Sequence, residues 1–420
     1  MTMTTPDLTA LRQRFPALAR EQDGRPVVIV DAPGGSQVPD TVIEAVSARY
    51  RDGISNLDGA FSTSRETHEV VEAARRAGAD LVGTDPERIV FGANSTSLLF
   101  HVARSFTRTL GPGDEVVVTR LDHDANIRPW ALAARDAGAT LRWVDLRTED
   151  ATLDRDSFRA ALSDRTRLVA FTLASNGVGT VTPAAELVRV AKDAGALVAV
   201  DGVHLAQHRA IDFDALGADL LSVSPYKVFG PHLGMLAASP AVLDAWDPYR
   251  VRPAQDYPSP ERWETGTQNH EGLAGFVASV EYLAEAGRIY GSPVDGARGA
   301  QVRAAFQVFG AHERELSRRF VEGLATIPGA RLWGVPGTDR LDERTPTFAV
   351  RLGDQHPRAT AEALGERGIY VWDGHYYAME LFERLGLLES GGAVRIGFCH
   401  YHTSAEVDRV LEALAEIAAR

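Results

Sequence analysis

The sequence has 420 residues, 45% hydrophobic and 24% charged, a composition that is ordinary for a globular protein and long enough for two domains. Its net charge of −13, with no clustered basic run, gives no support for binding to nucleic acid. A single cysteine excludes an intrachain disulfide framework and a cysteine-based zinc site. Because neither a signal-peptide pattern nor an apolar run of about 18 residues is present, we expect a cytoplasmic protein without a membrane span.

Short β-rich runs alternate with helical stretches along the first part of the chain. The strand candidates are a run that begins near residue 26 (RPVVIVDA), 88–93, 114–119, 141–146, 167–174, 197–202 and 220–225. Between them, segments such as TVIEAVSARYRDG, ETHEVVEAARRAGADLVG and PAAELVRVAKDAGA carry apolar residues at helical spacing. This alternation predicts an α/β fold with a mostly parallel, seven-stranded sheet, in which ligands bind beyond the carboxyl ends of the strands.

The pattern changes after about residue 240. Residues 245–263 are rich in proline and aromatic residues and are interpreted as an irregular loop, and two long helical stretches follow. β-like runs at TFAVRL, IYVWDG and AVRIGF, with helices between and after them, predict a smaller α+β unit. We therefore divide the chain into an N-terminal segment (1–25), a large α/β domain (26–290) and a small C-terminal α+β domain (291–420).

A lone lysine and a lone acid follow two neighbouring strand candidates. Lys227 lies just past the strand at 220–225, in SVSPYKVFGPHLGML, and Asp201 ends the strand in LVAVDG. A bare carboxylate among apolar neighbours is costly unless a cation pairs with it, and a protonated pyridine nitrogen is such a partner. An amine that forms a Schiff base and an acid paired with a pyridinium are the chemical minimum for pyridoxal 5′-phosphate (PLP). The sequence therefore predicts a PLP site.

Other strand ends offer residues of the types that PLP needs. Ser95 and Thr96 begin a helix directly after a strand, where hydroxyls and free backbone N–H groups suit a phosphate. His123 can stack on a planar ring, and the Asn176 amide can hydrogen-bond to a ring hydroxyl, as can His204. All of these side chains follow predicted strands, so we expect them to converge at one edge of the sheet.

Several spaced motifs resemble those of the class V aminotransferases, which are fold type I PLP enzymes, and in particular their cysteine-desulfurase-like branch. The run from VAVDGVH to SVSPYKVFG resembles the cofactor segment, and DHDANIRPW, SNGVGTVTP and WETGTQN match further family motifs in the same order. The likeness extends from VDAPGG, near residue 31, to VRIGF, near residue 398. It implies the family's large PLP-binding domain and smaller C-terminal domain.

The resemblance implies a role for each matching residue of the cofactor site. Lys227 would form the Schiff base and later carry the Cα proton, Asp201 would pair with the pyridine nitrogen, and His123 would stack on the ring. The other residues expected to contact the cofactor, around its phosphate and ring hydroxyl, are Ser95, Thr96, Asn176, His204, Ser224 and Tyr226.

The resemblance also implies a substrate site and a partner. Arg395, in AVRIGF, matches the arginine that grips the α-carboxylate of an amino-acid substrate, for which a bidentate guanidinium fork is suited. Tyr376 and Tyr377 are candidates for the same site. Thr267, in GTQN, is expected to reach the phosphate bound by the neighbouring subunit, which would make the active unit a homodimer.

The sequence departs from the family pattern at three positions. Family members that move sulfur carry a nucleophilic cysteine in a GHHCA-like stretch, which here reads WDGHYYAMEL with Tyr377 in the cysteine's place. A phenol, with an unperturbed pKa of about 10, is a poor acceptor of sulfane sulfur. Cys399 is expected to be a small core residue, so the sequence argues against persulfide-forming desulfuration. Tyr226 replaces a histidine of the family and His204 a glutamine.

The reaction is predicted only in outline. With Arg395 holding the carboxylate, Cα–H cleavage is favoured over decarboxylation, and β-elimination, transamination and racemisation all remain open. Our leading hypothesis is a lyase that acts on a cysteine-like or other β-substituted amino acid. An aminotransferase is an alternative, as is an epimerase of the isopenicillin N epimerase kind, which would need His123, Tyr376 or Tyr377 as a second acid/base. The carboxylate clamp argues against a PLP-binding regulator without turnover, and the lack of a GxGxxG or GxxxxGK[ST] motif argues against a nucleotide-binding protein.

Overall fold

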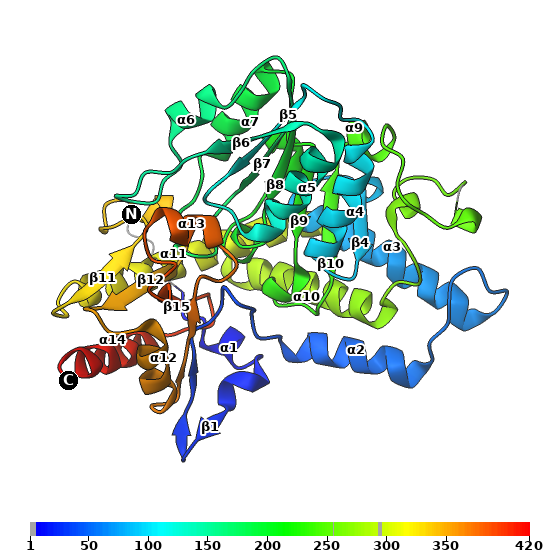
Figure 1. Cartoon of the computed structure of the whole chain (residues 1–420). Coiled ribbons are helices and arrows are strands. Elements are labelled where there is room, and N and C mark those ends of the chain that lie inside the picture. Colours follow the sequence, from blue (N-terminus) through cyan, green and yellow to red (C-terminus); the bar gives the residue numbers. More distant parts are fainter. Residues whose placement is uncertain (1–5, 255, 293–295) are drawn as a thin grey trace.

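The computed structural model describes residues 6–254, 256–292 and 296–420, so the first five residues of the predicted N-terminal segment lie outside the described residues. A seven-stranded sheet forms the centre of one half of the molecule (Figure 1). Its strands, in spatial order, are β4 (Ile89–Gly92), β10 (Gly234–Ala238), β9 (Leu220–Val223), β8 (Leu197–Asp201), β7 (Thr166–Thr172), β5 (Glu115–Thr119) and β6 (Thr140–Val144). Only β10 runs against its neighbours, so the mostly parallel seven-stranded sheet is confirmed.

The predicted membership of this sheet is wrong for one strand. The run that begins near residue 26 gives β3 (Val28–Ile29), which pairs in parallel with β13 (Ile369–Tyr370) in a separate two-stranded sheet. The seventh strand of the large sheet is instead β10, which the sequence pattern did not reveal. Because the partner of β3 lies near the other end of the chain, its local β-like pattern could not show which sheet it joins.

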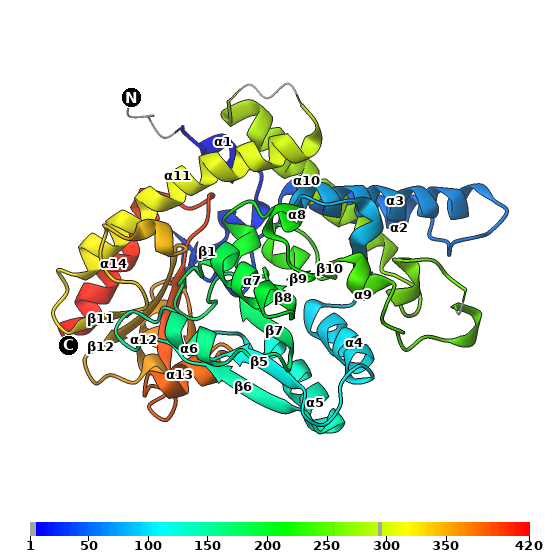
Figure 2. The same ribbon diagram turned by 90° about the horizontal axis from the view of Figure 1, so that it is seen from above.

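Successive residues of the central strands face two different hydrophobic cores. In β4, Ile89 and Phe91 belong to one core and Val90 to the other. The first core is covered by α3 (Ser62–Val82), α7 (Ala184–Asp193), α8 (Phe213–Leu216) and α10 (His270–Tyr290), and the second by α4 (Ser95–Thr107) and α5 (Arg128–Ala137). Figure 2 shows these helices on the two sides of the sheet. Burial on both faces explains why the strands read as continuous apolar runs.

A second sheet lies beside the first, near the C-terminus (Figure 1). It contains β11 (Ala330–Trp333), β12 (Thr347–Leu352), β15 (Ala393–Gly397) and β14 (Trp372–Gly374), in that order and all antiparallel. The helices that pack on it are α11 (Arg298–Leu324), α12 (Pro357–Gly365) and α14 (Ser404–Ala418), whereas α13 (Met379–Arg384) contributes Leu381 and Phe382 to the first core. The run IYVWDG, predicted as one strand, is divided between β13 and β14, which belong to different sheets. The domain boundaries at residues 26 and 290 stay predictions.

Helix α11 connects the two halves of the molecule (Figure 2). Its first part contributes Phe306 and Phe309 to the core under the large sheet, and its second part contributes Leu316 and Phe320 to a third core under the small sheet. The remaining helices and strands are α1 (Thr9–Arg12), β1 (Glu21–Gln22), β2 (Arg25–Pro26), α2 (Asp40–Asp52), α6 (Arg155–Ala160) and α9 (Pro240–Leu243). Among the 3-10 turns, those at Asp124–Asn126, Leu205–Gln207 and Pro225–Lys227 follow strands of the large sheet.

The topology brings chemically active residues to one edge of the large sheet. Strands β4, β5, β7, β8 and β9 run in the same direction, so the loops after them meet at this edge. The segment after β3 reaches the same place, where Asp31 bridges to Gly397 at the end of β15. None of the helices in the described ranges is both long and apolar enough to cross a membrane.

Candidate active site

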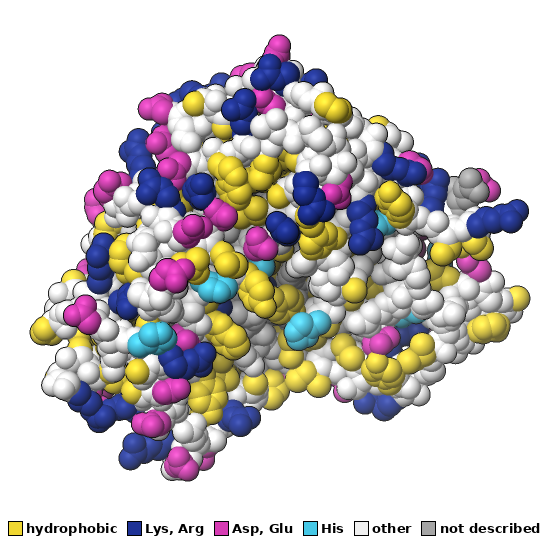
Figure 3. Space-filling model, in the orientation of Figure 1, with side chains coloured by type: hydrophobic (Ala, Val, Ile, Leu, Met, Phe, Trp, Pro, Cys, Tyr) yellow, Lys and Arg dark blue, Asp and Glu magenta, His cyan; other side chains and the backbone are white. Residues whose placement is uncertain are grey.

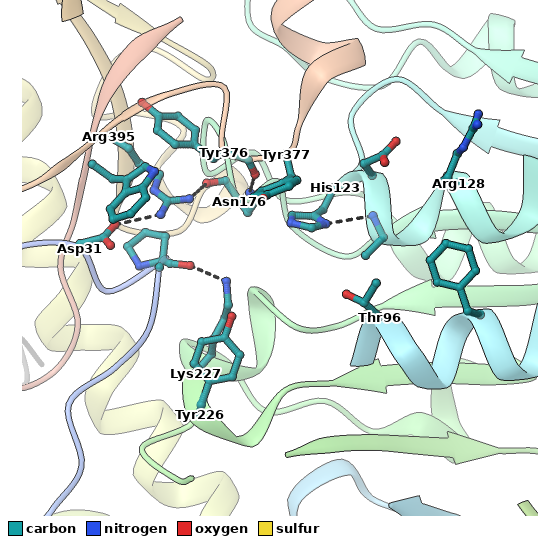
Figure 4. A pocket seen from close by; sticks show the side chains of 16 residues that line it. Asp31, Thr96, His123, Arg128, Asn176, Tyr226, Lys227, Tyr376, Tyr377 and Arg395 are labelled. Carbon is teal, nitrogen blue, oxygen red and sulfur yellow. Dashed lines mark hydrogen bonds and ion pairs between the residues drawn. The ribbon is translucent and has the colours of Figure 1, made fainter. Parts of the chain in front are cut away.

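Two adjoining cavities open at this edge of the sheet. The larger, of about 490 Å³, is lined by residues from both ends of the chain, including Asp31, Pro33, Thr96, His123, Asn176, Tyr226, Lys227, Trp372, Tyr376, Tyr377 and Arg395 (Figure 4). The smaller, of about 70 Å³, shares several of these residues and adds Ser95, Asp201, His204 and Ser224. Figure 3 shows the surface hollowed near the middle of this face. Every predicted site residue except Thr267 therefore lines one of the two cavities.

Lys227 lies in the turn after β9 with its amine buried. Its Nζ donates a hydrogen bond to the carbonyl oxygen of Pro33 at 2.6 Å. Burial, followed by the nearby Arg395 guanidinium, lowers the pKa of Lys227 to about 8, although Asp201 and Asp31 act in the opposite direction. About a tenth of the amine is therefore unprotonated, and nucleophilic, at pH 7, far more than of an ordinary lysine.

Asp201 ends β8 and faces the smaller cavity. Its Oδ1 accepts hydrogen bonds from the backbone N–H of Val203, at 2.8 Å, and from the Ser222 hydroxyl, at 3.4 Å. Burial raises the pKa of Asp201, and the positive charge of Lys227 opposes that rise. The ionised carboxylate is therefore stable only beside a positive charge in the cavity. A protonated pyridine nitrogen would supply that charge.

A second buried acid, Asp122, was not identified from the sequence. It accepts hydrogen bonds from the Thr119 hydroxyl and from Asn126 Nδ2, the latter at 2.7 Å. Burial raises the pKa of Asp122 to about 8, and the nearby Asp201 adds to the rise. The only signal for Asp122 was its place beside His123 in DHDANIRPW.

His123 caps the 3-10 turn after β5 and lies at the junction of the two cavities. Its Nδ1 accepts a hydrogen bond from the backbone N–H of Ala125 at 3.0 Å, which assigns the ring proton to Nε2. Burial, with smaller contributions from Lys227 and Arg395, lowers the pKa of His123 to about 4. A neutral ring is thus held in a fixed orientation beside the cavity, stacked with Tyr377 at a centroid distance of 5.6 Å.

The start of α4 forms a polar cradle. Asn94 caps the helix through its side chain, which accepts a hydrogen bond from Ser97 N. The Ser95 hydroxyl donates to Val223 O at 2.7 Å and lies 2.8 Å from the Ser224 hydroxyl. A Cβ atom at Gly234 of β10 would lie 2.3 Å from the Asn94 carbonyl carbon, so the first turn of α4 packs directly on this glycine. The helix N-terminus and its two hydroxyls suit a phosphate group.

The opposite wall of the smaller cavity carries two buried polar atoms without partners. Asn176 donates through Nδ2 to Tyr376 O at 2.9 Å, while its Oδ1 has no hydrogen-bond partner in the described part of the chain. His204 Nε2 lies 3.0 Å from the Thr345 hydroxyl and 3.1 Å from that of Thr347, while its buried Nδ1 has no such partner there. An unpaired buried polar atom costs about 1–3 kcal/mol, so a ligand hydroxyl at this wall would be stabilising.

Arg395 lies on β15 at the far wall of the larger cavity, with 4% of its side chain exposed. Its Nη2 pairs with Asp31 Oδ1 at 2.9 Å, and its Nη1 donates to Asn176 O at 3.2 Å. The guanidinium lies over the Tyr376 ring, 4.4 Å from its centroid. Asp31 and Pro33 were not predicted as site residues, because their contacts are with residues far away in the sequence.

Tyr376 and Tyr377 have different surroundings. Both have left-handed backbone conformations, with φ of 52° and 58°, which are unusual for bulky residues. Tyr376 is buried, and its hydroxyl donates to Ala393 O, so it acts as a packing residue and as the surface on which Arg395 lies. Tyr377 is 67% exposed at the cavity mouth, and its carbonyl accepts from Asp124 N at 2.8 Å.

Two further predicted residues lie outside the cavities. Cys399 is fully buried in the loop after β15, and burial raises the pKa of its thiol, so the prediction of a core cysteine is confirmed. Thr267 is exposed in the loop before α10. Within residues 6–254, 256–292 and 296–420, no group of three or more His, Cys, Asp or Glu side chains is arranged to hold a metal ion.

Comparison with known proteins decides the family. The family model described as Aminotransferase class-V matches residues 28–290 and 302–410. The chain belongs to the class V aminotransferase family. This class V protein is 32% identical to an uncharacterised protein of Mycobacterium tuberculosis, over 98% of this chain and 99% of the relative. It is 30% identical to a cysteine desulfurase of Yersinia pestis, over 97% of each chain.

A solved structure supports the same assignment. The apo cysteine desulfurase of Thermococcus onnurineus superposes with a TM-score of 0.87 at 25% identity, over 100% of this chain and 99% of that one. The class V protein therefore has the fold of type I PLP enzymes and is itself a PLP-dependent enzyme. Its site fits PLP, because the cavities hold a buried amine, a buried acid that needs a cation, a cradle suited to phosphate and unpaired polar atoms at the opposite wall.

Proposed function

We propose that the protein is a lyase that removes the Cα proton of a cysteine-like or other β-substituted amino acid and expels the β substituent without forming a protein persulfide. The observation that carries this proposal is the buried Lys227 amine beside Arg395, in a cavity whose lining contains no cysteine among the described residues. When bound, PLP supplies an electron sink for the charge left at Cα.

Each residue has a proposed task. Lys227 attaches the cofactor, and its pKa of about 8 suits the amine to accept the Cα proton and to pass it to the leaving sulfur. Asp201 keeps the pyridine nitrogen protonated, and the Ser95 and Ser224 hydroxyls hold the phosphate together with Thr96. Arg395 binds the α-carboxylate, while His123 stacks on the ring.

The relatives support carbon–sulfur cleavage, since two of the similar proteins carry the name cysteine desulfurase. Persulfide formation requires a thiol at the reacting sulfur. The only cysteine of this sequence is Cys399, which is fully buried, and Tyr377, which the resemblance places at the family's cysteine position, is exposed at the cavity mouth. We therefore propose that sulfur leaves as a small molecule.

Racemisation is less well supported. It needs a second acid/base on the opposite face of Cα, and the candidates were His123, Tyr376 and Tyr377. The Tyr376 hydroxyl is occupied by Ala393 O, and the neutral His123 has its unprotonated nitrogen occupied by Ala125 N–H. Only the exposed Tyr377 remains, and transamination stays open as an alternative.

Product analysis of the holoenzyme on a panel of amino acids tests the proposed reaction. From cysteine and water we expect pyruvate, ammonia and sulfide in equal amounts. A keto acid that keeps its β substituent would identify an aminotransferase, and deuterium at Cα with inversion would identify an epimerase. Either result would reject the lyase.

We further propose a homodimer in which Thr267 contacts the cofactor phosphate of the partner subunit. Thr267 is exposed and lies outside both cavities of its own chain, so any contact with a cofactor has to be made in another subunit. An apolar patch, which we call the α2 patch, is exposed on and after α2 and contains Ile43, Tyr50, Ile54, Leu57 and Phe61. Figure 3 shows hydrophobic side chains over this helix. A second copy is its proposed partner, and a cytoplasmic location stays a prediction.

A further inference from the structure

Arg395, the proposed binding site of the substrate α-carboxylate, is already paired with a carboxylate of the protein itself. Asp31, on the segment after β3, places Oδ1 2.9 Å from Nη2 of Arg395, and both side chains line the larger cavity (Figure 4). Arg395 is 4% exposed and Asp31 22%, so the arginine is desolvated while part of the acid faces the cavity. A buried guanidinium without a partner would be strongly destabilising, which explains why an acid is held there.

The ion pair leaves Arg395 able to bind a second anion. A guanidinium has five N–H groups. Asp31 and Asn176 O each accept from one terminal nitrogen, and Nε has no hydrogen-bond partner in the described ranges. Nε is itself buried, but each terminal nitrogen keeps a second N–H, so an α-carboxylate can bind to Arg395 from the cavity while Asp31 stays in place and fixes the plane of the fork.

The second oxygen of Asp31 packs against the cavity wall. A Cβ atom at Gly34 would lie 2.0 Å from Asp31 Oδ2, and Gly34 itself lines the cavity. The absence of a side chain at Gly34 thus makes room for the carboxylate beside the substrate space. For a bound α-carboxylate the charge of Arg395 offsets that of Asp31, whereas a second carboxylate of the substrate that lies beside Asp31 has no such partner on the clamp and would be repelled.

We propose that Asp31 is the positioning and specificity-determining residue of the clamp, which orients Arg395 and selects amino acids with uncharged side chains over those with acidic ones. The inference rests on the proposed function, because it takes Arg395 to be the site of the α-carboxylate.

Binding without turnover tests the inference. The L forms of α-methylserine and α-methylaspartate have no Cα–H, so they can occupy the holoenzyme without being consumed, and their dissociation constants follow from the change in the absorbance of the bound cofactor. We expect the wild-type protein to prefer α-methylserine by about tenfold or more, the ratio that about 1.4 kcal/mol gives.

Two substitutions separate charge from position. Asp31→Asn keeps an oxygen for Arg395 Nη2 but removes the charge, so we expect it to reduce the preference about tenfold while α-methylserine binds within about threefold of wild type. Asp31→Ala removes both, so we expect both probes to bind about tenfold more weakly or worse. Unfolding temperatures and PLP content establish that each variant folds and is loaded.

Asp124→Asn is the matched control, because Asp124 lines the same cavity but is not paired with Arg395. We expect it to change the preference less than Asp31→Asn does, because its charge does not lie beside Arg395. The inference is overturned if Asp31→Asn keeps the wild-type preference, or if Asp124→Asn changes the preference equally. If neither probe binds to the loaded wild-type protein, the proposed amino-acid site itself is rejected, and the inference with it.

Discussion

Lys227 is buried without a carboxylate in hydrogen-bond contact, since its nearest acceptor is the Pro33 carbonyl. Desolvation of the charged form lowers its pKa from 10.5 to about 8. An ordinary lysine would be almost fully protonated at neutral pH and would react slowly with an aldehyde. The environment of this side chain thus activates it before any cofactor is bound.

The rate at which PLP attaches to the cofactor-free protein should depend on this pKa. Because only the unprotonated amine is a nucleophile, we expect the rate to rise with pH and to level off above about 8. Borohydride reduction at timed intervals followed by peptide mapping measures it. The chain has only two lysines, and Lys192, whose amine pairs with Asp219, serves as an internal control that should stay unlabelled. A midpoint near 10.5, or a label on Lys192, would contradict the assignment.

At the scale of elements, the contact between β10 and α4 is the tightest part of the proposed phosphate cradle. We expect Gly234→Ala to displace the first turn of α4, to destabilise the protein by about 1–3 kcal/mol and to weaken PLP binding. Thermal unfolding and PLP titration measure the two effects. Gly310→Ala on α11 is the control, because a Cβ atom there meets nothing within 4 Å and the change should be neutral or stabilising by up to about 1 kcal/mol. Equal effects of both substitutions would disprove the role of the cradle.

The elements that could be predicted from the sequence are those with a strong local pattern. The strand before Lys227 and the strand that ends at Asp201 are short, mostly apolar runs, each followed by a turn, and both lie where they were expected. β10 was missed because GMLAA follows a glycine-containing turn and has no β-branched or aromatic residue, so nothing local marks it as a strand. Its antiparallel direction also departs from the simple strand–helix alternation.

The residues of the candidate site likewise include some that could be predicted from a local pattern and some that could not. Asp201, His123 and Asn176 were predictable because each follows its own strand, and parallel strands bring such positions together. Asp31 was not predictable as a site residue, since its partner is Arg395 and no local pattern links two positions so far apart. Likewise, the burial that raises the pKa of Asp122 depends on packing from several segments.

At the scale of the whole molecule, the α2 patch should hold two copies together. An aspartate in a buried apolar interface is costly, so we expect Ile54→Asp to weaken self-association at least about tenfold and, because the partner's Thr267 is withdrawn, to weaken PLP retention as well. Sedimentation and PLP titration measure both. Ile289→Asp, at another exposed isoleucine outside the patch, should change neither. A monomeric wild-type protein would disprove the proposed dimer.

The pairing of β3 with β13 has a consequence for biosynthesis. A nascent chain that has left the ribosome only as far as residue 290 already contains every strand of the large sheet. It also contains Lys227. It lacks β13 and Arg395, which hold the segment carrying Asp31 and Pro33 in place. The wall that carries Arg395 is therefore completed only when the end of the chain has been translated, whereas the residues proposed to hold the cofactor have all been made by then, so the site for the substrate is the last part of the pocket to form.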